Sequence, residues 1–203
     1  MTYGQLRNQV LKLLNQYSIA GAVVANSYNN QQDYLNRIVD LANDAILEIA
    51  TTARKIPALI QLSDLASEER GKEVWYELPE DFYQLQSGSV VTTREGWTLH
   101  TNVYALHGKN FLVVPLEEDG NYSLVYYRYP TLLPEKPGED VLLDNEPETH
   151  SAVAFYVASF LVAQDDSFLC SLFYNKYEDK LSKMGPGVSA EIHPVADAYH
   201  FFG

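Results

Sequence analysis

The chain has 203 residues, of which 46% are hydrophobic and 20% are charged, and its formal net charge is −13 at pH 7. A chain of this length can bury a sizeable core, and its composition excludes an intrinsically disordered protein, a collagen-like repeat and a disulfide scaffold. The negative charge argues against a general nucleic-acid-binding surface and against binding to an anionic membrane. The single cysteine, Cys170, cannot form an intramolecular disulfide, which favours a reducing compartment.

Two amphipathic helices are predicted at the start of the chain. The first covers residues 2–17 and the second covers about 31–55, and in both the apolar residues recur every three or four positions. Pro57 ends the second helix, because proline lacks the amide hydrogen that a helix interior requires. Residues 58–70 fit neither a helical nor a strand pattern clearly.

From residue 72 the pattern changes to that of β-strands. Threonine, valine and tyrosine become frequent, and turn signals such as Glu95-Gly96 and Asp119-Gly120 recur every few residues. We expect short strands joined as an antiparallel meander. They cover residues 73–77, 83–92, 97–105, 110–114 and 122–129.

Two further helices are predicted after a proline-rich loop over residues 130–147. The first starts near Glu146-Pro147-Glu148, since acidic residues and an early proline are typical of helix N-termini, and it reaches about Asp165. The second covers residues 167–184, and residues 188–203 show no periodicity.

These elements define an α+β fold that is mainly helical. It combines an N-terminal helix pair, a small antiparallel β-meander, long C-terminal helices and an irregular tail. We expect an N-terminal helical part over residues 1–70, the meander over 71–130, a loop with helices over 131–184 and an extended tail over 185–203, all in one compact unit.

No catalytic template is present. The sequence lacks G-x-G-x-x-G, a P-loop, H-E-x-x-H and G-x-S-x-G. His100 and His107 could meet across a hairpin, but two strand histidines are more often surface residues than metal ligands. The adjacent acids at 80–81 and 117–119 are more often solvated turns than catalytic pairs. We therefore expect no catalytic residue, no metal and no cofactor.

One short segment has a clear structural interpretation, the turn formed by Leu78, Pro79, Asp81 and Phe82. Pro79 removes a backbone donor, so the preceding strand must end there. We expect Asp81 to accept backbone amides in the turn and Phe82 to fill the core.

The acidity of the chain is localised. Residues 1–56 hold four acids against five bases, whereas residues 116–148 hold nine acids against Arg128 and Lys136 alone. A solubility role explains such a distribution as well as a functional one does.

The order of elements resembles the head–tail connector proteins (adaptor or head-completion proteins) of tailed bacteriophages. In that family a Leu-Pro-x-Asp-Phe-like turn follows the helical N-terminus, as at residues 78–82 here. The C-terminal helix begins near an acidic Pro-Glu stretch like Glu146-Pro147-Glu148 and continues with small and aromatic residues like Ala154-Phe155-Tyr156. The resemblance covers most of the chain.

This resemblance implies a structural virion protein without catalysis, located in the neck of the virion and made in the host cytoplasm. It implies a homo-oligomeric ring, expected to be a dodecamer, that docks below the portal protein and contacts a tail or stopper protein. The ring extends the channel through which genomic DNA passes without specific binding, and no membrane is involved. The 15 tyrosines suit lateral contacts, and an acidic lining would repel phosphates.

The C-terminal tail contains large apolar side chains that a free solvated tail normally lacks. We expect Val195, Tyr199, Phe201 and Phe202 to form a tail interface on a neighbouring subunit or on the portal. The alternative is that the tail folds back on its own domain.

Three other functions stay open at this point. The chain could be a tail-completion or baseplate component. It could be a ligand-binding module that stacks sugars on Trp75, Trp97 and Tyr104, or an enzyme of another type that uses paired carboxylates.

Overall fold

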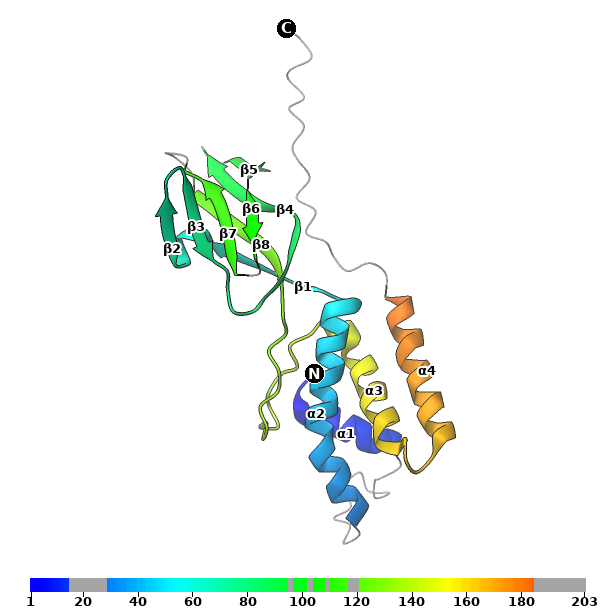
Figure 1. The fold of residues 1–203 in the computed structure, drawn as a ribbon. Coiled ribbons are helices and arrows are strands. Elements are labelled where there is room, and N and C mark those ends of the chain that lie inside the picture. Colours follow the sequence, from blue (N-terminus) through cyan, green and yellow to red (C-terminus); the bar gives the residue numbers. More distant parts are fainter. Residues whose placement is uncertain (15–28, 95–96, 102–103, 109, 117–120, 185–203) are drawn as a thin grey trace, which may run out of the picture. The chain divides into compact units, whose positions relative to one another are not determined.

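The structure is a computed structural model. It describes residues 1–14, 29–94, 97–101, 104–108, 110–116 and 121–184 (Figure 1). The expected tail, residues 185–203, therefore lies outside the described residues.

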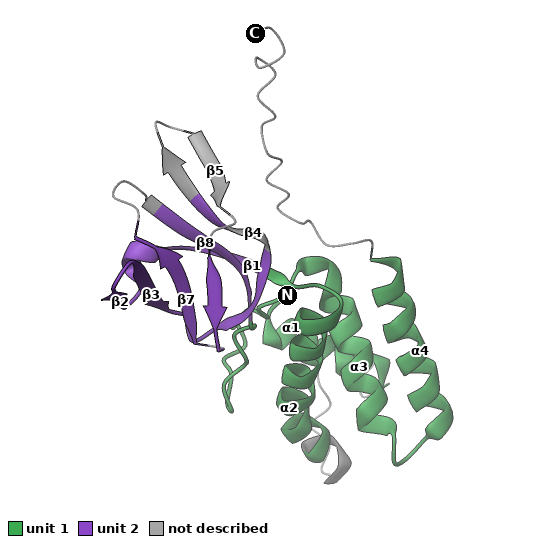
Figure 2. Ribbon diagram, turned by 45° about the horizontal axis from the view of Figure 1, so that its top comes forward, with its two compact units in different colours: residues 1–56, 129–187 green, residues 57–128, 188–203 purple. Residues whose placement is uncertain are grey.

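The chain divides into two compact units (Figure 2). The helical unit comprises the described residues of Met1–Ile56 and Tyr129–Gly187, and the β-rich unit comprises those of Pro57–Arg128. The β-rich unit is thus one continuous segment inserted between two halves of the helical unit. It starts before residue 71, where the sequence places the boundary.

The helical unit confirms the predicted pairs of helices at the start and end of the chain. Its helices are α1 (Tyr3–Leu13), α2 (Asn29–Thr52), α3 (His150–Val162) and α4 (Ser167–Lys183). α1 begins with a capping box, in which the Thr2 hydroxyl accepts from the backbone of Gln5 and the Gln5 side chain accepts from the backbone of Thr2.

The core of the helical unit lies between these helices. α2 contributes one buried stripe, and α3 is buried on most sides because its residues are small or apolar almost without interruption. α3 lies between α2 and α4 in both views (Figures 1 and 2). The fully buried members include Leu6, Val10, Ile38, Ala42, Ile46, Ile49, Ala152, Val157 and Leu161.

The loop after the β-rich unit is fastened to the helical unit by specific hydrogen bonds. The Asn43 amide on α2 donates to the carbonyl of Leu133 at 3.0 Å and accepts from its backbone N–H at 2.7 Å. Tyr3 donates its backbone N–H to the carbonyl of Val141 at 2.8 Å. An irregular segment is therefore held in one position without helix or sheet.

The β-rich unit contains two four-stranded sheets, with the orders β1-β8-β4-β5 and β2-β3-β7-β6. The registered strand pairs are antiparallel. The strands are β1 (Ile56–Gln61), β2 (Ser67–Arg70), β3 (Glu73–Glu77), β4 (Phe82–Arg94), β5 (Trp97–Thr101), β6 (Ala105–His107), β7 (Phe111–Pro115) and β8 (Asn121–Arg128). The α+β class is confirmed, but two sheets replace the expected single meander.

Two features explain the difference from a meander. Residues 58–70, which follow no clear pattern in the sequence, form most of β1, a short 3-10 turn (Leu62–Asp64) and β2 instead of extending the helical part. The expected strand 97–105 is divided between β5 and β6, which belong to different sheets. β5 and β6 follow one another in the sequence but therefore lie in different sheets.

A single apolar cluster joins the two sheets. Val90 and Leu124 come from one sheet and Leu112 and Val114 from the other, and all four are buried. Alternate residues along each strand contribute, as the two-residue period of a strand requires.

Candidate functional site: polar contacts and exposed faces

The turn predicted at residues 78–82 is anchored to β8. Phe82 donates its backbone N–H to the carbonyl of Pro79 at 2.9 Å, which closes the turn. Asp81 Oδ1 accepts from the Tyr126 hydroxyl at 2.9 Å, a side-chain donor where we expected backbone amides. The Phe82 ring stacks on Tyr126 with centroids 5.8 Å apart. Leu78 is buried in the same apolar cluster.

The predicted tail interface lies outside the described residues. Val195, Tyr199, Phe201 and Phe202 all belong to 185–203, so their docking stays a prediction.

The aromatic residues considered as a sugar platform do not share one face. Tyr104 packs against the apolar cluster between the sheets, whereas Trp75 lies beside Phe111 and His107. The Arg70 guanidinium lies over the Trp75 ring, 4.5 Å from its centroid. Because Arg70 covers one face of the indole and Tyr104 is turned inward, these two residues do not form a shared stacking surface. The side chain of Trp97 is outside the description.

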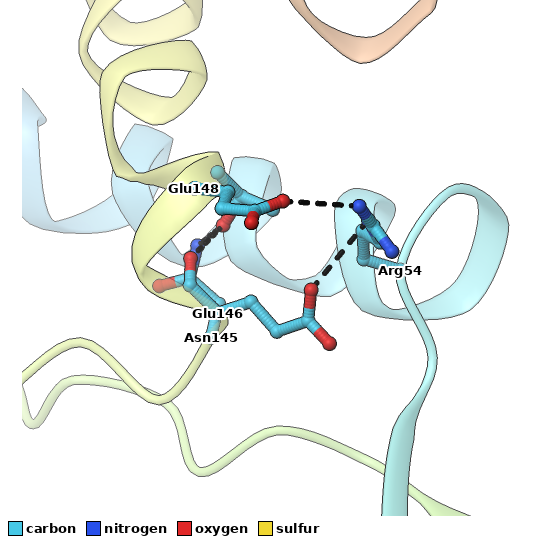
Figure 3. A network of polar contacts seen from close by, with 5 residues as sticks. Arg54, Asn145, Glu146 and Glu148 are labelled. Carbon is cyan, nitrogen blue, oxygen red and sulfur yellow. Dashed lines mark hydrogen bonds and ion pairs between the residues drawn. The ribbon is translucent and has the colours of Figure 1, made fainter. Parts of the chain in front are cut away.

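A buried cation connects α2 to the start of α3 (Figure 3). Arg54, whose side chain is 8% exposed, places Nη2 3.1 Å from Glu148 Oε2 and Nε 3.5 Å from Glu146 Oε2. Both carboxylates point toward the guanidinium (Figure 3). Among the described atoms, Arg54 Nε has no hydrogen-bond partner, so Glu146 acts on it through charge.

This ion-pair network corrects the predicted start of the third helix. The acids at 146 and 148 precede α3, which begins at His150 after a 3-10 turn (Pro147–Thr149). They neutralise Arg54, a long-range partner that helix-start signals do not indicate. Arg54, three residues before Pro57, is the one feature of the sequence that could have indicated this contact.

Tyrosine hydroxyls bonded to carboxylates recur in both units. In the helical unit, Tyr177 donates to Glu48 Oε1 at 2.9 Å and Tyr34 donates to Asp165 Oδ2 at 2.7 Å. Burial, followed by these hydrogen bonds, raises the pKa of Tyr177 far above its usual range and raises the pKa of Tyr34 to about 12. At neutral pH these tyrosines are therefore fixed donors and not proton carriers.

An open pocket of about 500 Å³ lies in the helical unit. Tyr3, Arg7, Asp40 and Lys136 are among the residues that line it, and Arg7 pairs with Glu139 at its wall. Its charges are mixed in sign and partly neutralised by one another. Its described lining includes no histidine, cysteine or serine, so it offers no activated nucleophile of the usual kind.

The histidine side chains that the structure describes, His107 and His150, do not converge on a metal site. His150 is buried, and the amino group of Met1 lies 2.9 Å from its Nδ1; burial lowers the pKa of His150. His107 lies against Trp75. Among the residues that the structure describes, no three histidine, cysteine, aspartate or glutamate side chains are placed to hold a metal ion.

Over the described part of the chain, every helix is too short or too polar to cross a bilayer.

The fold and these contacts define a class of protein: an α+β subunit whose prominent features are buried structural contacts and exposed charged faces. Comparison with known families agrees. The family described as SU10 adaptor protein matches residues 1–195, and the chain belongs to this family of phage head–tail adaptors. The resemblance seen in the sequence is thereby confirmed, as is a virion location. No curated protein is significantly similar in sequence.

Proposed function

We propose that the protein forms a homo-oligomeric ring below the portal, extends the DNA channel and joins the head to the tail. The observation that carries this proposal is the match to a head–tail adaptor family over residues 1–195. The family also supports a structural and non-enzymatic role. A dodecamer is the expected assembly, with the portal on one side and a tail or stopper protein on the other.

The acidic surface supports passage of DNA without specific binding. In the loop after β8, Glu135, Glu139 and Asp140 are exposed, Lys136 is the one base within residues 129–145, and Arg7 of α1 pairs with Glu139. Carboxylates that line or flank a channel repel phosphates, so the channel wall does not bind the DNA duplex.

Microscopy tests the ring directly. Negative-stain images and native mass spectrometry of the purified protein, alone and with the portal protein of the same phage, should show closed rings of one size. A protein that stays monomeric in both samples would overturn the proposal.

A gel-shift assay tests the channel. At about 0.15 M salt the assembled protein should show negligible affinity for duplex DNA, because phosphate contacts need exposed clusters of lysine and arginine. Tight binding at that salt concentration would contradict the conduit.

The proposal includes docking of the tail. Burial of Phe201 and Phe202 against a partner would contribute about 1.5–3 kcal/mol each. Deletion of residues 188–203 should abolish ring formation or portal binding and leave the melting temperature of the monomer unchanged. A large loss of monomer stability with intact assembly would show that the tail packs on its own domain.

The proposal also excludes a metal or cofactor, since the sequence lacks the ligand spacings and phosphate loops that would hold one. Elemental analysis of chelator-washed protein should find no stoichiometric metal. Unfolding that depends on a chelator would contradict this expectation.

A further inference from the structure

α4 has a long exposed side that its packing on α3 leaves uncovered. Phe173 and Tyr177 are the residues of α4 that are fully buried. Phe168 and Leu172, by contrast, are 72% and 39% exposed. They lie four residues apart, so they are neighbours on one side of the helix.

The same side becomes basic toward the C-terminal end of α4. Lys176 and Lys180 continue the four-residue spacing from Phe168 and Leu172, and Lys183 lies one turn further. Asp179 lies on the same side and pairs with Lys183 at 2.6 Å, so the positive charge that this side offers to a partner comes from Lys176 and Lys180. The ammonium groups of Lys176 and Lys180 lie 5.6 and 5.9 Å from the centroid of Phe155 on α3. These three lysines are part of a total of only 14 basic residues in a chain with net charge −13. We call this side of α4, from Phe168 to Lys183, the basic edge.

α2 carries the opposite charge on its own exposed side. Asp33, Asp40 and Asp44 are spaced by seven and four residues, which places them on one side of the helix, and all three are exposed. Arg37 lies on this side too and pairs with Asp33 at 3.9 Å, so Asp40 and Asp44 supply the negative charge that this side offers to a partner. Leu47 lies on the same side and is 38% exposed. The buried residues of α2 form the opposite side of the helix. We call the side from Asp33 to Leu47 the acidic edge.

The two edges belong to the outer helices of one layer. α3 lies between α2 and α4 (Figures 1 and 2), so the acidic edge and the basic edge belong to the two helices that flank it. Asp40 of the acidic edge also borders the open pocket, together with Arg7 and Lys136. In a second copy of the chain each edge meets a complementary one: Lys176 and Lys180 meet Asp40 and Asp44, and Phe168 and Leu172 meet Leu47 as an apolar neighbour. Such a contact is head-to-tail, and repetition with a fixed rotation closes a ring.

We infer that the basic edge of α4 in one subunit docks on the acidic edge of α2 in a second copy of this chain. The inference rests on the proposed ring and names its lateral contact. Charge complementarity selects the partner, because like charges brought together across an interface are strongly unfavourable. The apolar pair at the start of α4 then gives the contact a region that excludes water.

Charge reversal tests the contact. One variant combines Asp40→Lys with Asp44→Lys, and a second combines Lys176→Glu with Lys180→Glu. Both retain good helix formers at helical positions. Each variant alone should weaken subunit association by more than about tenfold, measured by sedimentation and native mass spectrometry. The protein carrying all four substitutions should form rings again, because the charges are opposite once more.

Two control variants reverse acidic and basic charges in the β-rich unit. Asp64→Lys with Glu80→Lys, and Lys72→Glu, alter exposed residues of the β-rich unit and should leave rings intact. Circular dichroism and melting curves of each variant verify folding. Recovery in the four-substitution protein cannot be produced by variants that merely fail to fold.

The outcomes separate this inference from the proposed function. If the wild-type protein forms rings and neither edge variant weakens them, the lateral contact is elsewhere and the inference is overturned while the ring stands. Intact rings with lost portal binding would assign these edges to another virion protein and would also overturn it. A wild-type protein that forms no ring, with or without portal, refutes the proposed function and the inference together.

Discussion

The helical unit and the β-rich unit are stabilised in different ways. The core of the helical unit combines residues from both ends of the described chain: Leu6 and Val10 on α1 pack in one cluster with Val157 and Leu161 on α3. The β-rich unit builds a smaller buried cluster from a single continuous segment, residues 57–128. Stability of the first therefore depends on long-range contacts, and that of the second on neighbouring strands.

The two units also differ in the residues that they expose along their edges. In the β-rich unit the edge strand β2 is exposed throughout and carries Glu68, Glu69 and Arg70. Charged edges of this kind prevent strand addition by other chains. Exposed apolar side chains occur in both units, with Leu59 and Leu116 in the β-rich unit and Phe168 and Leu172 in the helical unit. In the helical unit the exposed pair Phe168 and Leu172 continues along one side of α4 into Lys176 and Lys180.

The largest expected effects come from the two cores. Ile46→Ala in the helical unit and Leu124→Ala in the β-rich unit each remove a side chain that is 0% exposed and should cost about 3 kcal/mol. If the units unfold separately, calorimetry will show two transitions, and each variant will lower only its own. Leu59→Ala, at a residue that is 63% exposed, is the control. A shift of both transitions by Ile46→Ala would contradict separate units.

The next effect concerns the buried cation of the helical unit. Glu146→Gln combined with Glu148→Gln leaves the Arg54 charge buried without a counter-ion and should cost about 3 kcal/mol of unfolding free energy. Arg54→Met should cost less, because the remaining carboxylates, 33% and 72% exposed, can be hydrated. Denaturant titration of the three proteins checks the order. A larger loss for Arg54→Met would show that the arginine acts mainly through packing.

Removal of a tyrosine hydroxyl should have a smaller effect on stability, and the same change can be compared in the two units. Tyr177→Phe in the helical unit and Tyr126→Phe in the β-rich unit each remove one hydrogen bond to a carboxylate and should cost about 1 kcal/mol at neutral pH. Chemical denaturation measures both. If either unit loses less unfolding free energy than the error of the method, water replaces the hydrogen bond in that unit.

The raised pKa of Tyr126 predicts a loss of stability at alkaline pH. Burial and the bond to Asp81 raise the pKa of Tyr126 to about 12, whereas an unfolded tyrosine titrates near about 10. The unfolded state then releases its proton first, so stability falls as pH rises from about 10 through about 12. Tyr126→Phe should make this fall shallower for the β-rich unit. An unchanged slope would exclude Tyr126 as its source.

The smallest expected effects are local. Thr2→Ala removes the cap of α1 and Gly71→Ala places a side chain at φ +69°, and each should cost about 1 kcal/mol or less. A methyl group at residue 71 has no described atom within 4 Å, so strain of the backbone is its only cost. Gly71→Asn is the control, since asparagine tolerates this conformation better. Equal losses for the alanine and asparagine variants would contradict the strain.

Local patterns were enough to predict several elements. α2, α4 and strand β3 lie within a few residues of their predicted bounds, because helical and strand periods are visible in the sequence. Which strands pair with one another was not predictable in this way. The partners β3 with β7, and β4 with β8, are far apart in the chain, and no turn signal links them.

The candidate sites show the same limit. A turn at residues 78–82 followed from Pro79 alone, since proline has no backbone donor. The bond from Tyr126 to Asp81 did not, because a hydroxyl on a distant strand leaves no local signal. Arg54 with Glu146 and Glu148 is a second case of this kind: the acids satisfied the rule for a helix start, although they neutralise a cation that follows the end of α2.

The insertion of the β-rich unit has a consequence for synthesis on the ribosome. Residues 57–128 leave the exit tunnel as a complete segment, so both sheets can form before α3 and α4 are translated. α1 and α2 must wait for residues 150–183, and during that interval the apolar stripe of α2 has no permanent partner. Slower translation of this interval would lengthen the exposure of Ile38, Ala42 and Ile46 to chaperones and to other nascent chains.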